Sequence, residues 1–135
     1  MKLLIDTNVI LDIFLKRNPF FSDSYGAVRK ALENGDQCFL SATAATDIFY
    51  ILRKHLKSAK DAKTHLTDLK RLAKFADVLA SDVTHAMESD MDDFEDAVVD
   101  SVALRIGADY ILTRNVKDFS DAKTRAVTPT EFLAL

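Results

Sequence analysis

A short, continuously apolar run near the start of the chain, Leu3–Ile5, is followed directly by an acid, Asp6. A strand with one face in water alternates apolar and polar residues, so this run predicts a strand that is covered on both faces, as in a parallel sheet between helices. Asp6 then lies at the carboxyl end of the strand, the edge where open parallel sheets bind ligands. The alternative is that Asp6 only caps a helix that begins near Val9.

The rest of the chain alternates short apolar segments with helical patterns. The predicted further strands are Cys38–Leu40, Asp77–Ala80, Tyr110–Thr113 and Ala126–Val127. The predicted helices cover Val9–Leu15, Ser22–Asn34, a segment from Ser41 or Thr43 to Leu56, Ser58–Phe75, Ser81–Met87, Phe94–Ile106 and a brief terminal segment over Phe132 and Leu133. Strands joined through helices predict an α/β fold, here a three-layer α/β/α sandwich with a four- or five-stranded, mostly parallel sheet. Residues 1–135 then form a single domain.

Composition limits the class of protein. The only cysteine, Cys38, has no partner for an internal disulfide. No signal peptide and no apolar stretch of membrane-spanning length is recognisable, so we expect a cytoplasmic protein without a membrane partner.

The net charge of −3 hides a strong asymmetry along the chain. Arg53–Lys74 holds eight Lys or Arg residues and two acids, whereas Asp82–Asp100 holds eight acids and neither Lys nor Arg. The basic segment, which includes Lys54 and Lys57, can bind a polyanion such as RNA through its phosphates. A lysine-rich, solvated face is the alternative for that segment.

Four acids are expected at one edge of the sheet. Asp6 and Asp118 follow the first and fourth predicted strands, and Asp47 and Asp96 lie near the N-terminal ends of helices that follow strands. Carboxylates within about 5 Å of one another repel by roughly 3 kcal/mol per pair at an effective dielectric constant near 20, so such a cluster requires a cation or protons. Oxygen ligands without His or Cys favour Mg²⁺ or Mn²⁺ over zinc.

Three stretches resemble the signatures of PIN domains, in particular the small bacterial ones related to VapC toxins. They are Leu4–Asn8, Asp93–Ala97 and Ala108–Phe119, and the similarity extends to Thr128–Phe132. The resemblance implies a Mg²⁺- or Mn²⁺-dependent endoribonuclease that hydrolyses RNA phosphodiester bonds. Such proteins are often dimers, and an antitoxin protein often holds them inactive as part of a toxin–antitoxin pair.

The resemblance also implies roles for individual residues. Asp6, Asp96 and Asp118 match family acids and are the expected metal ligands. Asp47 matches a fourth catalytic acid, although members more often carry Glu there. Asn115 stands where many members carry a further Asp, which weakens or shifts one metal position.

Supporting residues surround these acids in the same resemblance. Thr113 matches a hydroxyl residue that positions an acid or a water, and Asn8 matches the polar residue after the first strand. Asp93, in the second block, and Asn115 complete this supporting group. Arg114, at the rim, joins Lys54 and Lys57 as an expected RNA contact.

The sequence allows two alternatives to a PIN-like nuclease. Aspartyl-phosphate proteins fit poorly, because phosphatases of the haloacid dehalogenase type need a second Asp where Asn8 stands, and receiver domains need an acceptor Asp where Ser41 stands. The stronger alternative is a PIN-like module that has lost catalysis and only binds RNA or protein. Asp47 and Asn115 favour it, whereas the three matching acids argue against it.

Overall fold

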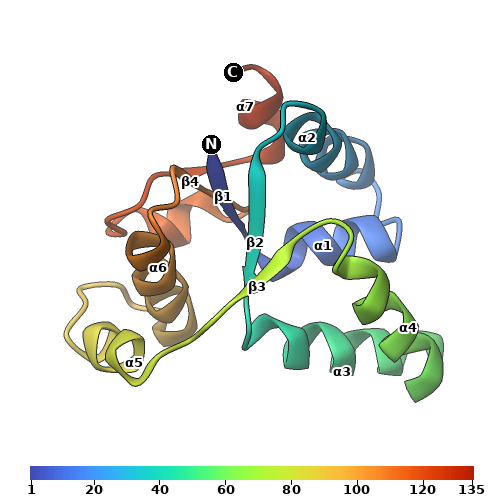
Figure 1. Ribbon diagram of the computed structural model, residues 1–135, viewed down its shortest axis with the longest axis horizontal. Coiled ribbons are helices and arrows are strands. Elements are labelled where there is room, and N and C mark those ends of the chain that lie inside the picture. The colour runs from blue at the N-terminus through green and yellow to red at the C-terminus, as the bar shows by residue number, and fades with distance from the viewer.

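Five parallel strands form one sheet in the middle of the computed structural model, which describes residues 1–135 (Figure 1). The strands are β1 (Lys2–Ile5), β2 (Gln37–Ser41), β3 (Lys74–Ala76), β4 (Tyr110–Leu112) and β5 (Ala126–Val127). Their order across the sheet is β3-β2-β1-β4-β5. The chain therefore moves outward from β1 in one direction and later returns to the other side of β1 for β4 and β5. β1 and β4 border the switch point, where parallel sheets open a crevice at the carboxyl ends of their strands.

Helices cover both faces of the sheet, which confirms the predicted α/β sandwich. They are α1 (Thr7–Phe14), α2 (Phe21–Glu33), α3 (Ala44–Leu56), α4 (Ala59–Leu69), α5 (Ala80–Met87), α6 (Phe94–Ile106), α7 (Pro129–Leu133) and the 3-10 helix η1 (Val116–Phe119). Figure 1 shows α5 and α6 on one side of the strands and α1 to α4 on the other.

The strand β1 serves both cores at once. Leu3 and Ile5 belong to the larger apolar core, under α1 to α4, while Leu4 belongs to the smaller one, under α5 and α6. All three side chains are buried. Successive side chains of a strand point to opposite faces, so a strand between two helical layers needs apolar residues throughout.

Local residues fix the ends of two helices. α6 ends at Gly107, which adopts a left-handed conformation with φ of 72°. In α7, Thr128 accepts a hydrogen bond from the Glu131 backbone N–H, and the Glu131 side chain accepts one from the Thr128 backbone N–H. No helix of the protein is both long enough and apolar enough to span a membrane.

The predicted third strand was wrong. The strand is Lys74–Ala76, and the segment predicted as a strand, Asp77–Ala80, leads into α5. β3 is an edge strand with two exposed residues, so it lacks the continuous apolar run that marks the central strands. The predicted starts of two helices, at Ser22 and Ser81, were each one residue late, because α2 begins at Phe21 and α5 at Ala80.

Candidate active site

Asp6 lies where β1 passes into α1, and three donors hold its carboxylate. Oδ1 accepts a hydrogen bond from the Thr7 backbone N–H at 2.8 Å, and Oδ2 accepts one from Thr113 Oγ1 at 2.7 Å and one from Asn8 Nδ2 at 3.3 Å. Asp6 therefore does cap α1, and it also stands at the carboxyl end of the central strand. The cap fixes its orientation at the switch point of the sheet.

The segment after β4 brings two further predicted residues to this edge. Thr113 is fully buried, and its Oγ1, which donates to Asp6, also accepts a hydrogen bond from the Asn115 backbone N–H at 3.0 Å. The backbone carbonyl of Asn115 in turn accepts from the Asp118 backbone N–H, which starts η1. Asp118 is consequently carried on a short helical turn anchored next to Asp6.

The N-terminus of α6 supplies the acids on the other side. Asp93 caps the helix, since its Oδ1 accepts a hydrogen bond from the Asp96 backbone N–H at 2.9 Å. Asp96 follows in the first turn and is half-buried. The partial positive charge of a helix N-terminus favours carboxylates at these positions.

The pKa values indicate that these acids share one electrostatic environment. Burial raises the pKa of Asp6, with smaller contributions from the charges of Asp118 and Asp93, while the hydrogen bonds from Thr113 and Thr7 oppose the shift. The pKa of Asp96 is raised to about 7, first by burial and then by the charges of Asp93, Asp6 and Asp118. None of the five ion pairs of the structure involves Asp6, Asp96 or Asp118. The cluster thus has no internal cation to neutralise it.

Asp47 lies next to Glu95, an acid that was not among the predicted site residues. Asp47 lies in the first turn of α3, and its hydrogen bond with Glu95 is the main cause that raises the pKa of Glu95 to about 7. Burial and the charges of Asp47, Asp93 and Asp96 raise it further. Glu95 precedes Asp96 by one residue and is therefore turned about 100° around α6 from it. The only signal in the sequence was its place inside the acidic block.

The predicted cationic residues lie apart from the acids. Lys54 and Lys57 are exposed at the C-terminal end of α3 and, with Tyr50 and Arg53, line a shallow pocket of about 560 Å³. Lys57, the C-cap of α3, follows Asp47 by ten positions, a span of roughly 15 Å at the rise of a helix.

Arg114, the third predicted RNA contact, points into the protein. Its Nε lies 2.7 Å from Asp12 Oδ2, and its guanidinium lies 3.9 Å from the centre of the Phe20 ring. Its side chain is 24% exposed, which leaves only part of it accessible to a ligand.

Comparison with known proteins gives the family. The family model of the PIN domain matches residues 2–117. The chain belongs to the PIN domain family. It is 29% identical to Ribonuclease VapC1 of Aquifex aeolicus over 139 aligned positions, which cover 97% of this chain and 92% of the relative.

Solved structures agree on the fold of this PIN domain. VapBC2 from Rickettsia felis bound to a DNA fragment from its promoter has a TM-score of 0.75 at 15% identity, covering 95% of this chain and 98% of that one. A toxin–antitoxin complex from Klebsiella pneumoniae has a TM-score of 0.69 at 20% identity, covering 94% and 97%. FitAB bound to the IR36 DNA fragment also has a TM-score of 0.69, at 15% identity and 94% coverage of both chains.

The acids of this PIN domain fit a hard divalent ion by their chemistry. As the side chains lie, no three Asp, Glu, His or Cys residues converge closely enough to hold a metal ion. However, the candidate ligand atoms of Asp6, Asp96 and Asp118 are all carboxylate oxygens, which Mg²⁺ and Mn²⁺ prefer. The pKa values of Asp96 and Glu95, both raised to about 7, also mean that the cluster retains protons near neutral pH, which a divalent cation would displace if it bound there.

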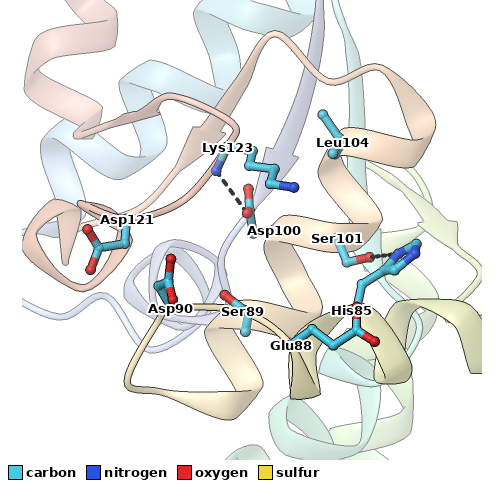
Figure 2. Close-up of a pocket in the computed structure, with 10 residues that line it drawn as sticks. His85, Glu88, Ser89, Asp90, Asp100, Ser101, Leu104, Asp121 and Lys123 are labelled. Carbon is cyan, nitrogen blue, oxygen red and sulfur yellow. Dashed lines mark hydrogen bonds between the residues drawn. The ribbon is translucent and has the colours of Figure 1, made fainter.

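An acidic pocket of the PIN domain is separate from this cluster. It has a volume of about 330 Å³ and lies beside α6, where Figure 2 shows Asp100, Ser101 and His85 among its lining residues. The Asp100 carboxylate accepts hydrogen bonds from the backbone N–H groups of Lys123 and Thr124, at 2.9 Å each. Asp100 thus anchors the loop before β5, and none of the predicted catalytic acids lines this pocket.

The raised pKa values predict that the metal-free PIN domain loses stability as the pH rises. Since Asp96 and Glu95 titrate near 7 in the folded protein and near 4 in the unfolded chain, the folded form binds more protons between these values. We expect the melting temperature in EDTA to be higher at pH 5 than at pH 8. Differential scanning calorimetry measures it, with Asp96→Asn as the variant that flattens the dependence. A wild-type melting temperature that rises from pH 5 to pH 8 contradicts the prediction.

Proposed function

We propose that this PIN domain is an endoribonuclease that uses Mg²⁺ or Mn²⁺ to hydrolyse phosphodiester bonds of RNA. One observation carries the proposal: Asp6, Asp96 and Asp118 share one edge of the sheet, and none of them forms an ion pair. Burial, followed by the charges of Asp93, Asp6 and Asp118, raises the pKa of Asp96 to about 7. The similarity to Ribonuclease VapC1 supports RNA as the substrate.

In this proposal, Asp6, Asp96 and Asp118 hold the ion. A divalent ion supplies a Lewis acid that lowers the pKa of a bound water and neutralises charge on the phosphate. The donors Thr7, Thr113 and Asn8 keep the Asp6 carboxylate in a fixed orientation. Glu95, whose pKa is raised to about 7 next to Asp47, is suited to exchange a proton with a nearby water.

The proposed substrate is single-stranded or looped RNA, because only an exposed strand can bend toward a cluster of this kind. Lys54 and Lys57 can bind its phosphates without reading the sequence. Arg114 adds a cation at the rim through the exposed quarter of its side chain.

The proposed protein partners are an antitoxin and a second copy of the chain, which makes the protein the toxin of a toxin–antitoxin pair. Solved relatives named as toxin–antitoxin assemblies support the antitoxin. On α3, Tyr50 and Ile51 are 62% and 43% exposed, which offers apolar surface to a partner.

The direct test is cleavage of a labelled single-stranded RNA by the purified protein. We expect cleavage in millimolar Mn²⁺ or Mg²⁺, loss of cleavage in EDTA, and recovery when the metal is added back, with the fragments separated by denaturing electrophoresis. RNA that stays intact in Mn²⁺ and in Mg²⁺, across single-stranded and hairpin substrates, contradicts the proposal.

A second candidate function is binding without catalysis. Two observations favour it: no three acids converge on one point as the side chains lie, and Asn115 stands where an acid is expected. The two functions differ in how the protein responds to Mn²⁺.

A further inference from the structure

A second buried carboxylate, Asp12, lies behind the candidate site on α1. It is fully buried, although it interrupts the apolar face of the helix. Arg114 Nε lies 2.7 Å from its Oδ2, Arg17 Nε lies 3.2 Å from its Oδ1, and Ser24 Oγ donates to Oδ2 at 3.0 Å. A buried carboxylate is tolerated only when it is paired in this way, so Asp12 and the two arginines form one unit.

Both arginines of this unit also contact Asn8. Arg17 Nη2 donates to the backbone carbonyl of Asn8 at 3.4 Å, and the Arg114 backbone N–H donates to Asn8 Oδ1 at 3.3 Å. Because its Oδ1 is engaged in this way, the amide of Asn8 presents Nδ2 to Asp6 Oδ2 at 3.3 Å. The orientation of Asn8 therefore depends on the groups that Asp12 holds.

Asp12 and the two arginines also hold the segment that directly follows β4. Arg114 directly follows Thr113, whose hydroxyl donates to Asp6 at 2.7 Å. The Arg114 side chain is held from two sides, by Asp12 and by the Phe20 ring under its guanidinium. This restrains the backbone from which Thr113 reaches Asp6.

We propose that Asp12 is a positioning residue of the candidate site. Through Arg114 and Arg17 it sets Asn8 and Thr113 in the geometry that orients the Asp6 carboxylate. The assignment rests on the proposed function, because it concerns the orientation of a proposed metal ligand. Groups that orient a metal ligand from behind commonly change metal affinity by about 10- to 100-fold when they are removed.

Asp82 offers a matched control elsewhere in the fold. It is also fully buried, and it is paired with Arg105 at 2.9 Å and with the hydroxyl of Ser101 at 2.9 Å. It lies on α5, in the other helical layer, and makes no hydrogen bond with Asp6 or Asn8. Asp82→Asn therefore weakens a pair of the same type and leaves the surroundings of Asp6 intact.

The first measurement uses metal-free protein and two-dimensional ¹H–¹⁵N NMR. In Asp12→Asn, we expect the side-chain amide signals of Asn8 and the backbone amide signal of Thr7, which donates to Asp6, to move. In Asp82→Asn they are expected to stay in place. Signals that are unmoved in both variants overturn the assignment, whatever the protein does with metal.

The second measurement is the Kd for Mn²⁺ by isothermal titration calorimetry. Asp12→Asn is expected to weaken binding about tenfold, and Asp82→Asn to leave it within twofold, although both variants melt at lower temperature. An equal loss of Mn²⁺ affinity in both variants would mean that Asp12 contributes only to the stability of the fold, and it would overturn the proposal. Wild-type protein that binds no Mn²⁺ counts against the proposed function, and the NMR comparison then still decides the role of Asp12.

If Asp12→Asn does not fold, Arg114→Lys takes its place. Lysine keeps the charge next to Asp12 but lacks the Nε–H of the guanidinium and its planar stacking on Phe20. We expect the same signals of Asn8 and Thr7 to move by a smaller amount. Unmoved signals in a folded Arg114→Lys protein overturn the assignment.

Discussion

Replacing Asp6 with Asn is expected to lower the rate of RNA cleavage by roughly a thousandfold, since several kcal/mol of transition-state stabilisation depend on the metal that it helps to hold. The substitution keeps the size of the side chain but removes its charge. It also replaces one of the two carboxylate oxygens, which accept from Thr7 and from Thr113 and Asn8, by an NH₂ group that cannot accept a hydrogen bond. The folded structure is expected to persist, because loss of one charge relieves repulsion in the metal-free cluster.

The matched control for this variant lies at the opposite edge of the sheet. Asp109 accepts a hydrogen bond from the Lys2 backbone N–H at 2.8 Å, just before β4 begins. Asp109→Asn removes the same charge without touching the cluster, so single-turnover cleavage rates should equal those of the wild type. Undiminished cleavage by Asp6→Asn would assign the activity to another site or to a contaminant.

The second large effect is stabilisation by Mn²⁺. At about one hundred times its Kd, a bound ion adds roughly 2.7 kcal/mol to the free energy of unfolding. For a domain of this size that corresponds to a rise in melting temperature on the order of 10 °C. Scanning calorimetry in EDTA and in Mn²⁺ measures it. Identical melting curves in the two conditions would argue strongly against the metal site.

Asn115→Asp uses the same measurement to separate an enzyme from a binding module. Asn115 is exposed beside η1, so an added charge near Asp118 costs about 1 kcal/mol in water. In a metal-binding protein this loss is present in EDTA and is compensated in Mn²⁺. In a module that binds no metal the loss is equal in both conditions, and that result would favour the second candidate function.

The central part of the fold was predictable because its signals are local. Leu3–Ile5 and Tyr110–Leu112 are continuous apolar runs, since both faces of these strands are covered. α6 was predicted with its exact bounds, because Gly107 provides the left-handed end that a helix of this type needs. The edge strand β3 was missed, since half-exposed strands carry no such run.

The site was predictable only in part, because some of its contacts follow from the order of the strands and others depend on how the helices pack. Asp6 and Thr113 follow adjacent parallel strands, so the topology alone brings them to one edge. Glu95 meets Asp47 through the arrangement of two helices, which no local pattern encodes. The orientation of the Arg114 side chain could not be predicted from the sequence either, because it depends on the buried carboxylate of Asp12.

The strand order has a consequence for when the candidate site forms during synthesis. Asp6 is made among the first residues, but its neighbour Thr113 lies 107 residues later in the chain. β1 pairs with β2 early, yet its other edge stays open until β4 has been made. A ribosome-bound chain that stops before β4 therefore lacks the Thr113 donor and Asp118. If the proposed metal site exists, we expect its capacity to bind metal to arise only once nearly the whole domain has left the ribosome.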